Sequence, residues 1–152
     1  MDRSLFAQSD IFADLEEEEL EGIAEICEVL EMRSGEYVFR EGDEGDRLYI
    51  VESGEVRISR VVPGTGEEAI TVLKRGACFG EMAILDHSKR STDAIVNARC
   101  KLLSISRANF EMMLQSDQAL ANKVLWSVVR MLCARLRMTN ETLRSLMVMA
   151  MF

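Results

Sequence analysis

The sequence predicts an α+β fold in which a β-rich middle region lies between two helical regions. In residues 34–106, short segments of alternating apolar and polar residues are separated by glycine-containing turns, a pattern typical of a β-sandwich or barrel. In the flanking residues 1–33 and 107–152 apolar residues recur at helical spacing, and no glycine or proline interrupts the second of these segments. The chain has 152 residues, 48% of them hydrophobic, and this is enough for a single domain with its own core.

The N-terminal region, residues 1–33, is expected to form helices. Asp14 precedes the carboxylates Glu16 to Glu19, and an N-cap followed by an acidic first turn is typical of a helix start. Apolar residues at helical spacing follow at Leu20, Ile23, Ala24, Cys27 and Leu30. We interpret the glutamates as a solvated helix face.

The middle region is expected to hold many short strands. Alternating apolar residues occur at Tyr37 and Phe39, Val56 and Ile58, Ile70 and Val72, Ala94, Val96 and Ala98, and Leu103 and Ile105. Turn compositions separate these segments at 34–35, 41–46, 53–54, 63–66 and 75–76. The regular spacing of strands and glycines favours a closed or two-layered β structure.

The C-terminal region, residues 107–152, is predicted to end in a long helix that starts near Asp117. A heptad seam follows Leu125, Val129, Leu132, Leu136, Thr139, Leu143, Leu146 and Ala150. In the first half of the helix further apolar residues widen this face, so we expect that half to pack on the β region. The second half is expected to pair with a second copy and form a homodimer. The alternative is a helix that docks entirely on its own domain.

Charge and cysteine usage exclude several partner classes. The formal net charge is -8 and the isoelectric point is near 4.8, which disfavours binding to nucleic acid or to anionic membranes. The four cysteines form no C-x-x-C pair and His87 is the only histidine, so no metal site or metal cofactor is expected. The sequence shows neither a signal peptide nor a membrane span, which predicts a cytoplasmic protein.

The segment 79–92 interrupts the β pattern with a short stretch of helical composition. A helix start directs unpaired N–H groups outward, and such groups suit a phosphate. Arg90 follows after a polar loop and can add a planar, bidentate pair, while Ser91 adds a hydroxyl donor. Glu81 can accept a hydrogen bond from a sugar hydroxyl. The alternative is an ordinary surface helix with solvated charges.

Residues 79–85 read FGEMAIL and residues 90–92 read RST. This run closely resembles the phosphate-binding cassette of cyclic-nucleotide-binding domains. The segments 12–20, 37–43 and 45–54 resemble the first helix and the early strands and turns of that family, and the long final helix resembles the dimer helix of catabolite-activator-type regulators. The resemblance implies an eight-stranded, jelly-roll-like β-roll with flanking N-terminal helices and a C-terminal dimerisation helix.

The resemblance also implies roles for individual residues. The position of Glu81 holds the ribose 2′-hydroxyl, and that of Arg90 pairs with the cyclic phosphate. The remaining phosphate-cradle positions are Gly80, Met82, Ala83 and Ser91.

At two further places the match to the family is less exact. Thr92 stands where an alanine is common in the family, although its position still belongs to the cassette. Thr139 and Asn140 match a Thr-Ser pair that contacts the adenine in the catabolite activator type. Thr139 is also the polar residue in the apolar seam, and setting the dimer register is an equal explanation for it.

These features predict a sensor that binds cAMP, and cGMP more weakly, without catalysis and with a protein effector that receives the signal. Two alternatives stay within the family: the sensor half of a truncated transcription regulator, and a roll that senses another ligand or the redox state. A metalloenzyme on a similar roll is disfavoured, because such chemistry needs several inward histidines or carboxylates.

Overall fold

The structure is a computed structural model that describes residues 4–152. The chain begins with α1 (Ser4–Ala7), α2 (Glu17–Glu25), β1 (Glu28–Met32) and β2 (Tyr37–Phe39). It continues through the long strand β3 (Arg47–Val62), β4 (Gly66–Leu73), β5 (Cys78–Phe79), helix α3 (Glu81–Asp86) and a second long strand, β6 (Asp93–Ser106). Helices α4 (Arg107–Ser116) and α5 (Gln118–Ala150) follow.

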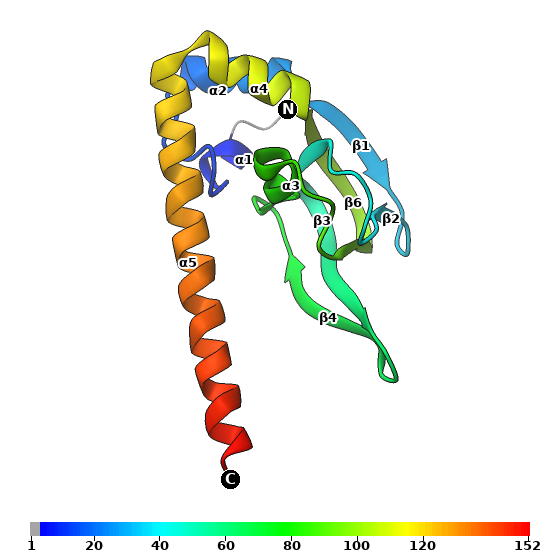
Figure 1. Ribbon diagram of the computed structural model, residues 1–152. Helices are drawn as coiled ribbons and strands as arrows, with labels where there is room; N and C mark the ends of the chain where they lie inside the picture. The colour runs from blue at the N-terminus through cyan, green and yellow to red at the C-terminus, as the bar shows by residue number, and fades with distance from the viewer. Residues whose placement is uncertain (1–3) are drawn as a thin grey trace.

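The strands form one antiparallel sheet with the order β1-β6-β3-β4, in which β2 also pairs with β6 and β5 with β3 (Figure 1). The pairing of β3 with β6 shifts register three times between Val51 and Val56. Such irregularities bend a strand and increase its twist. The sheet therefore curls around its own interior.

The predicted number of strands is wrong for the described residues, which form six strands rather than eight. The difference arises because β3 and β6 are long, with 16 and 14 residues. Each stays hydrogen-bonded through its irregular positions. In β3, the continuous strand spans residues 53–54, where the sequence predicted a turn. Gly54 lies at one of these positions, with φ near 84°.

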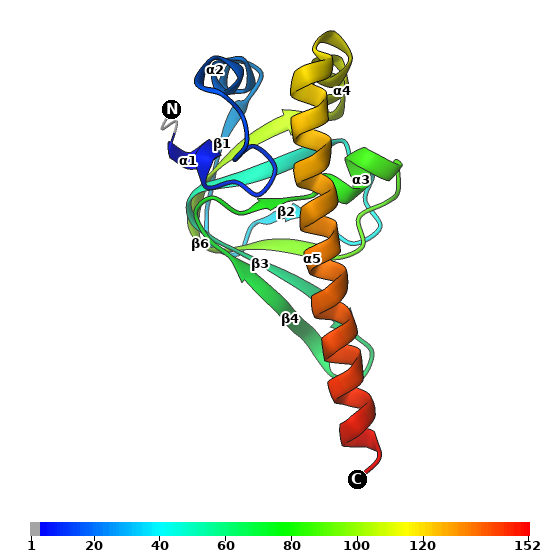
Figure 2. The same ribbon diagram turned by 90° about the vertical axis from the view of Figure 1, so that its left-hand side faces the viewer.

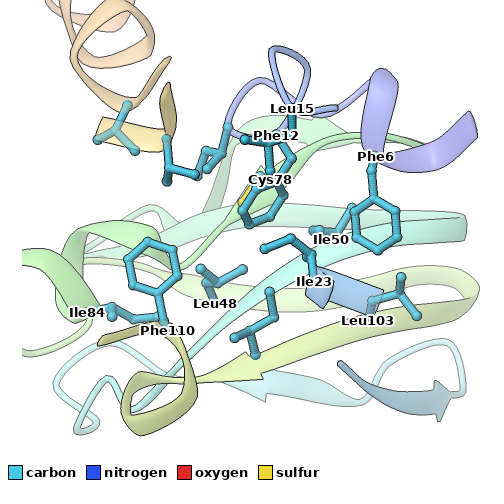
Figure 3. Close-up of a cluster of buried hydrophobic side chains, with 14 of the residues drawn as sticks. Phe6, Phe12, Leu15, Ile23, Leu48, Ile50, Cys78, Ile84, Leu103 and Phe110 are labelled. Atoms are coloured by element: carbon cyan, nitrogen blue, oxygen red, sulfur yellow. The ribbon is translucent and has the colours of Figure 1, made fainter. Parts of the chain in front are cut away.

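Alternate residues of β3 and β6 point into two different cores, as the pleat of a strand requires. One core lies between the sheet and the helices (Figure 3) and includes Phe6, Phe12, Leu15, Ile23, Leu48, Ile50, Cys78, Ile84, Leu103 and Phe110. The other lies inside the roll and comprises Tyr49, Val51, Val56, Phe79, Ala94, Val96, Cys100 and Leu102. The roll is thus filled on one face and covered by helices on the other.

The N-terminal prediction needs two corrections. Asp14 does not cap a helix: its carboxylate accepts hydrogen bonds from Ser127 and Arg130 of α5, and Glu16 is the N-cap of α2. Helical structure also stops at Glu25, because residues 28–32 form β1 and pair with β6. The helical spacing of the apolar residues was misleading here, since pairing with a neighbouring strand overrides local preference.

The long C-terminal helix is confirmed, with Asp117 as its N-cap. Its first half is anchored by Leu120, Val124, Val128 and Met131, which are buried. Residues 133–150 are all exposed, and the helix runs on past the roll (Figure 2). Among residues 4–152, no helix combines the length and the apolar character needed to cross a membrane.

Candidate functional site

The start of α3 requires a glycine. Gly80 has φ near 78°, in the left-handed region, and a Cβ atom there would lie 2.8 Å from Nη1 of Arg90 and 3.2 Å from the carbonyl oxygen of Arg47. Only glycine adopts this conformation freely and leaves space for the guanidinium. The backbone of Gly80 therefore touches Arg90 directly.

Arg90 is almost fully buried, with 5% of its surface exposed. Its Nη1 donates to the carbonyl oxygen of Gly80 at 2.8 Å, and its Nη2 donates to that of Arg47 at 2.6 Å. The guanidinium carbon also lies 4.2 Å from the centre of the Phe39 ring. Burial lowers the pKa of Arg90, but an arginine starting from so high a value stays charged at neutral pH.

No carboxylate within residues 4–152 forms an ion pair with Arg90, although Asp46 and Glu81 act on its charge from a greater distance. Its Nε atom is buried and makes no hydrogen bond there, while the other contacts go to neutral carbonyls and rings. A buried cation with an unsatisfied donor is costly unless an anion pairs with it. The surroundings of Arg90 are therefore suited to an anionic ligand.

The loop before β3 packs against Arg90 and α3. Arg90 donates its backbone N–H to Asp43, and Gly42 donates to the carbonyl of Arg90, each at 2.9 Å. A Cβ atom on Gly45 would lie 2.1 Å from the Cβ of Ala83 and 3.3 Å from the guanidinium carbon of Arg90. Gly45 is thus needed for close approach, and the loop fixes the position of Arg90 from both sides.

Glu81 is also buried, with 2% of its surface exposed, but its carboxylate has a partner. Arg135 of α5 forms an ion pair with Glu81 Oε1 and also reaches the carbonyl oxygen of Cys78 at 3.5 Å. Sequence reasoning missed Arg135, because it lies far along the chain from Glu81 and the helical spacing alone does not single it out. Through this pair the long helix contacts the first residue of α3.

Arg107, the first residue of α4, is a second basic residue that sequence reasoning missed. Its Nη2 donates to the carbonyl oxygens of Gly45 and Ala83, the latter at 3.1 Å. These two carbonyls belong to the loop and the helix that surround Arg90. Arg107 therefore holds them together from the side of α4, and no local sequence pattern indicated this.

The structure brings only some of the predicted residues together. Gly80, Glu81, Ala83 and Arg90 surround the start of α3. The other cassette residues lie nearer the surface: Met82 is 49% exposed, Ser91 is exposed and Thr92 is half-buried.

Thr139 and Asn140 are exposed on α5, apart from the buried part of the cassette. The hydroxyl of Thr139 donates to the carbonyl of Arg135, one turn earlier in the same helix, at 2.9 Å. Residues four apart share a helix face, so Thr139 lies on the same side of α5 as Arg135.

Within the described chain, no three His, Cys, Asp or Glu side chains gather in a way that could hold a metal ion. The cysteines are all free, and burial raises the pKa of Cys27 to about 12 and that of Cys78 well above its usual value. Because the thiolate is the reactive form, these two thiols are unreactive at neutral pH. This disfavours redox sensing by Cys27 or Cys78.

Comparison with known families agrees with this geometry. Residues 29–117, more than half of the chain, match the family model described as the cyclic nucleotide-binding domain. The chain belongs to this family. The resemblance to cyclic-nucleotide-binding domains is thereby confirmed.

The domain is similar to bacterial regulators and to kinase regulatory subunits. It is 30% identical over 142 residues to the CRP-like cAMP-activated global transcriptional regulator of Mycobacterium tuberculosis, covering 93% of this chain and 62% of the regulator. The catabolite activator protein of Thermus thermophilus is 30% identical with a TM-score of 0.81, over 91% of this chain and 63% of that one. The chain thus spans less than two thirds of these relatives.

A further solved relative is the regulatory domain of Toxoplasma gondii PKA, which was crystallised with cAMP. It is 30% identical to this chain, with a TM-score of 0.68, over 73% of this chain and 42% of that one. The shared part is the cyclic nucleotide-binding domain, and it occurs in proteins of different overall architecture.

Proposed function

We propose that the protein binds a cyclic nucleotide monophosphate, cAMP in preference to cGMP, and that it acts as a regulatory sensor rather than as an enzyme. The observation that carries the proposal is the buried guanidinium of Arg90. Its Nε atom lacks an acceptor, and no carboxylate in the described chain pairs with it. A cyclic phosphate would supply both the acceptor and the negative charge.

The neighbouring groups would complete a phosphate cradle. Gly80 leaves room for the guanidinium of Arg90 because it has no side chain, and the backbone N–H groups of Met82 and Ala83 lie in the first turn of α3. The exposed hydroxyl of Ser91 would add a further donor. Thr92, which is half-buried beside it, would form the edge of the cradle.

We assign Glu81 to the ribose 2′-hydroxyl. Arg135 engages its Oε1 atom, which leaves Oε2 as an acceptor for that hydroxyl. The ion pair also orients the carboxylate. Because Arg135 belongs to α5 and Glu81 to α3, the pair joins these two helices. A bound ribose would therefore lie next to a contact between the roll and the long helix.

The helix α5 would provide the contacts to the base and to a second copy. Thr139 and Asn140 would lie near the base, because they follow Arg135 by about one turn. Most of the heptad seam is uncovered, with exposed fractions of 44% at Leu125, 48% at Val129, 61% at Leu136, 49% at Leu143 and 56% at Leu146, whereas Leu132 packs against the core. An exposed apolar stripe of this length favours a homodimer.

A second candidate is the sensor part of a longer transcription regulator. The observation that favours it is the coverage, since the chain spans 62% of the mycobacterial regulator. The net charge of -8 disfavours direct contacts between these residues and DNA. Ligand binding is expected to be the same in both cases.

Calorimetric titration with cAMP and with cGMP tests the proposal. We expect saturable binding of one cAMP per chain and weaker binding of cGMP. The cAMP recovered after long incubation should be chemically unchanged, because no catalytic role is assigned. Absence of heat with both nucleotides, confirmed by equilibrium dialysis, would contradict the proposal.

A further inference from the structure

A groove lies between α2, α4 and the start of α5, and none of the residues that line it belongs to the segment 79–92. We propose that this groove docks a basic amphipathic helix of a partner protein. We call it the acidic groove. The inference goes beyond nucleotide binding, and it concerns how a signal would leave the domain.

The acidic groove is large and has an apolar floor. Its volume is about 660 Å³, and the floor is formed by Ile23, Ile26, Met112, Met113 and Leu120. Met112 is 65% exposed although its side chain is large and apolar. Methionine side chains are flexible and polarisable, and they adapt well to the apolar face of a bound helix.

The rim of the groove is negatively charged. The carboxylates around it belong to Glu16, Glu18, Glu19 and Asp117. Lys123 lies 2.9 Å from Glu19 and 3.8 Å from Glu16, so it neutralises only part of this charge. The carboxylate of Glu18 is exposed and has no ion pair within residues 4–152. The excess of carboxylates selects a basic partner over an acidic one.

Gly22 provides an independent reason to expect an occupant. It lies in the middle of α2 and lines the groove, yet its φ is outside the left-handed region. A Cβ atom added there would meet nothing within 4 Å. Glycine destabilises a helix relative to alanine, and neither the backbone nor the packing of the described chain requires it here. A close approach by another chain would explain this glycine.

The position of the groove links it to the long helix. Asp117 is both the C-cap of α4 and the N-cap of α5, and Leu120 in the floor belongs to the first turn of α5. A helix bound in the groove would contact the same helix that reaches Glu81 through Arg135. The groove is therefore placed to sense how α5 lies on the roll.

The test uses the 152-residue chain and a fluorescent model peptide of leucine and lysine, with the leucines at helical spacing. Gly22→Leu should fill the groove and lower the affinity for the peptide by roughly tenfold or more. The same variant should have an unchanged or higher thermal midpoint, because leucine favours a helix over glycine. Lost binding with retained folding is a result that a general destabilisation would not give.

Charge variants provide the matched control. Glu18→Lys at the rim should weaken peptide binding, whereas Glu68→Lys on exposed β4 changes the net charge equally and should leave it nearly unchanged. A peptide with glutamate in place of lysine should not bind. Equal effects of the two variants would overturn the proposal, because they would indicate unspecific attraction to an acidic protein.

Two further outcomes would also overturn it. The first is peptide binding that survives Gly22→Leu but is lost in Leu143→Lys, since the peptide would then bind the seam of α5. The second is a change of oligomeric state in Gly22→Leu, which would assign the groove to a second copy. Two measurements keep this proposal separate from the proposed function. Gly22→Leu, titrated with cAMP, should bind the nucleotide normally, and Arg90→Ala, titrated with the peptide, should still bind the peptide.

Discussion

Arg90 and Glu81 are both charged and almost fully buried, and they differ in how the charge is compensated. Arg90 contacts two carbonyl oxygens and an aromatic ring, and its Nε atom has no acceptor in the described chain. Glu81 is paired with Arg135. A ligand with an anionic group and a hydroxyl would pair its anionic group with Arg90 and donate its hydroxyl to Glu81. A cyclic nucleotide has both groups.

Glu81→Ala should weaken cAMP binding by about tenfold, since a hydrogen bond to a charged group contributes roughly 1.5–3 kcal/mol. The loss should be much smaller for 2′-deoxy-cAMP, which has no hydroxyl to donate. Calorimetry with the two nucleotides measures the difference. Equal losses for both ligands would show that Glu81 supports the fold of α3 and does not contact the ribose.

Arg135→Gln should lower the free energy of unfolding by about 1–3 kcal/mol, because the carboxylate of Glu81 is left buried without its donor. Arg137→Gln is the matched control, since Arg137 is an exposed arginine on the same helix. Urea denaturation of both variants gives the comparison. Equal stability of the two variants would mean that the Glu81–Arg135 pair does not hold α5 on the roll.

The residues of the site differ in how well the sequence identifies them. Glu81 and Arg90 stand in one short segment, so their spacing and their chemistry are visible together. Arg135 and Arg107 act through contacts with residues 54 and 24 positions away. Such contacts depend on how α4 and α5 fold back onto the roll. The residues next to Arg107 and Arg135 in the sequence do not indicate these contacts.

Among the secondary-structure elements, α3, α4 and α5 follow the sequence pattern closely. Their starts are marked by Gly80, Ser106 and Asp117, which occupy the N-cap positions. The sequence pattern predicts neither β1 nor the unbroken length of β3. Both result from pairing with β6 over long sequence distances. Local spacing thus predicts helices with caps better than it predicts strands whose partners decide their extent.

Leu136→Glu or Leu143→Glu should convert the proposed homodimer into a monomer, because each would place an unpaired charge in the seam. Met138→Glu is the control, since Met138 is 69% exposed and lies off the seam on the opposite side of the helix. Analytical ultracentrifugation at micromolar concentration measures the change. A wild-type protein that is already monomeric, or equal dissociation by all three variants, would contradict the proposed interface.

At the scale of the whole molecule, the proposed binding site and the long helix are linked by few contacts. The Glu81–Arg135 pair joins α3 to α5, and Arg107 joins the cassette to α4. Beyond Leu132 the helix is exposed in the single chain, so its position depends on these contacts and, in the proposed homodimer, on the second copy. A ligand shifts such an equilibrium only if it binds one arrangement more tightly.

We therefore expect cAMP to change hydrogen exchange in α5 between Leu132 and Leu146. Thr139→Ala combined with Asn140→Ala should retain most of the affinity, which the phosphate and ribose dominate, but should lose this change in protection. Hydrogen exchange followed by mass spectrometry, with and without cAMP, provides the measurement. Identical exchange of the wild-type helix in both states would exclude coupling through α5.

The most direct measurement is a calorimetric titration of the wild type, Arg90→Ala and Arg90→Lys with cAMP. The loss of a charge-assisted pair, roughly 1.5–3 kcal/mol, should lower the affinity of Arg90→Ala by about tenfold or more. Arg90→Lys should recover little, because an ammonium group cannot form the planar fork. Thermal unfolding of each variant verifies that the roll is intact. Titrations of wild type and Arg90→Ala that superimpose would contradict the assignment of Arg90 to the phosphate.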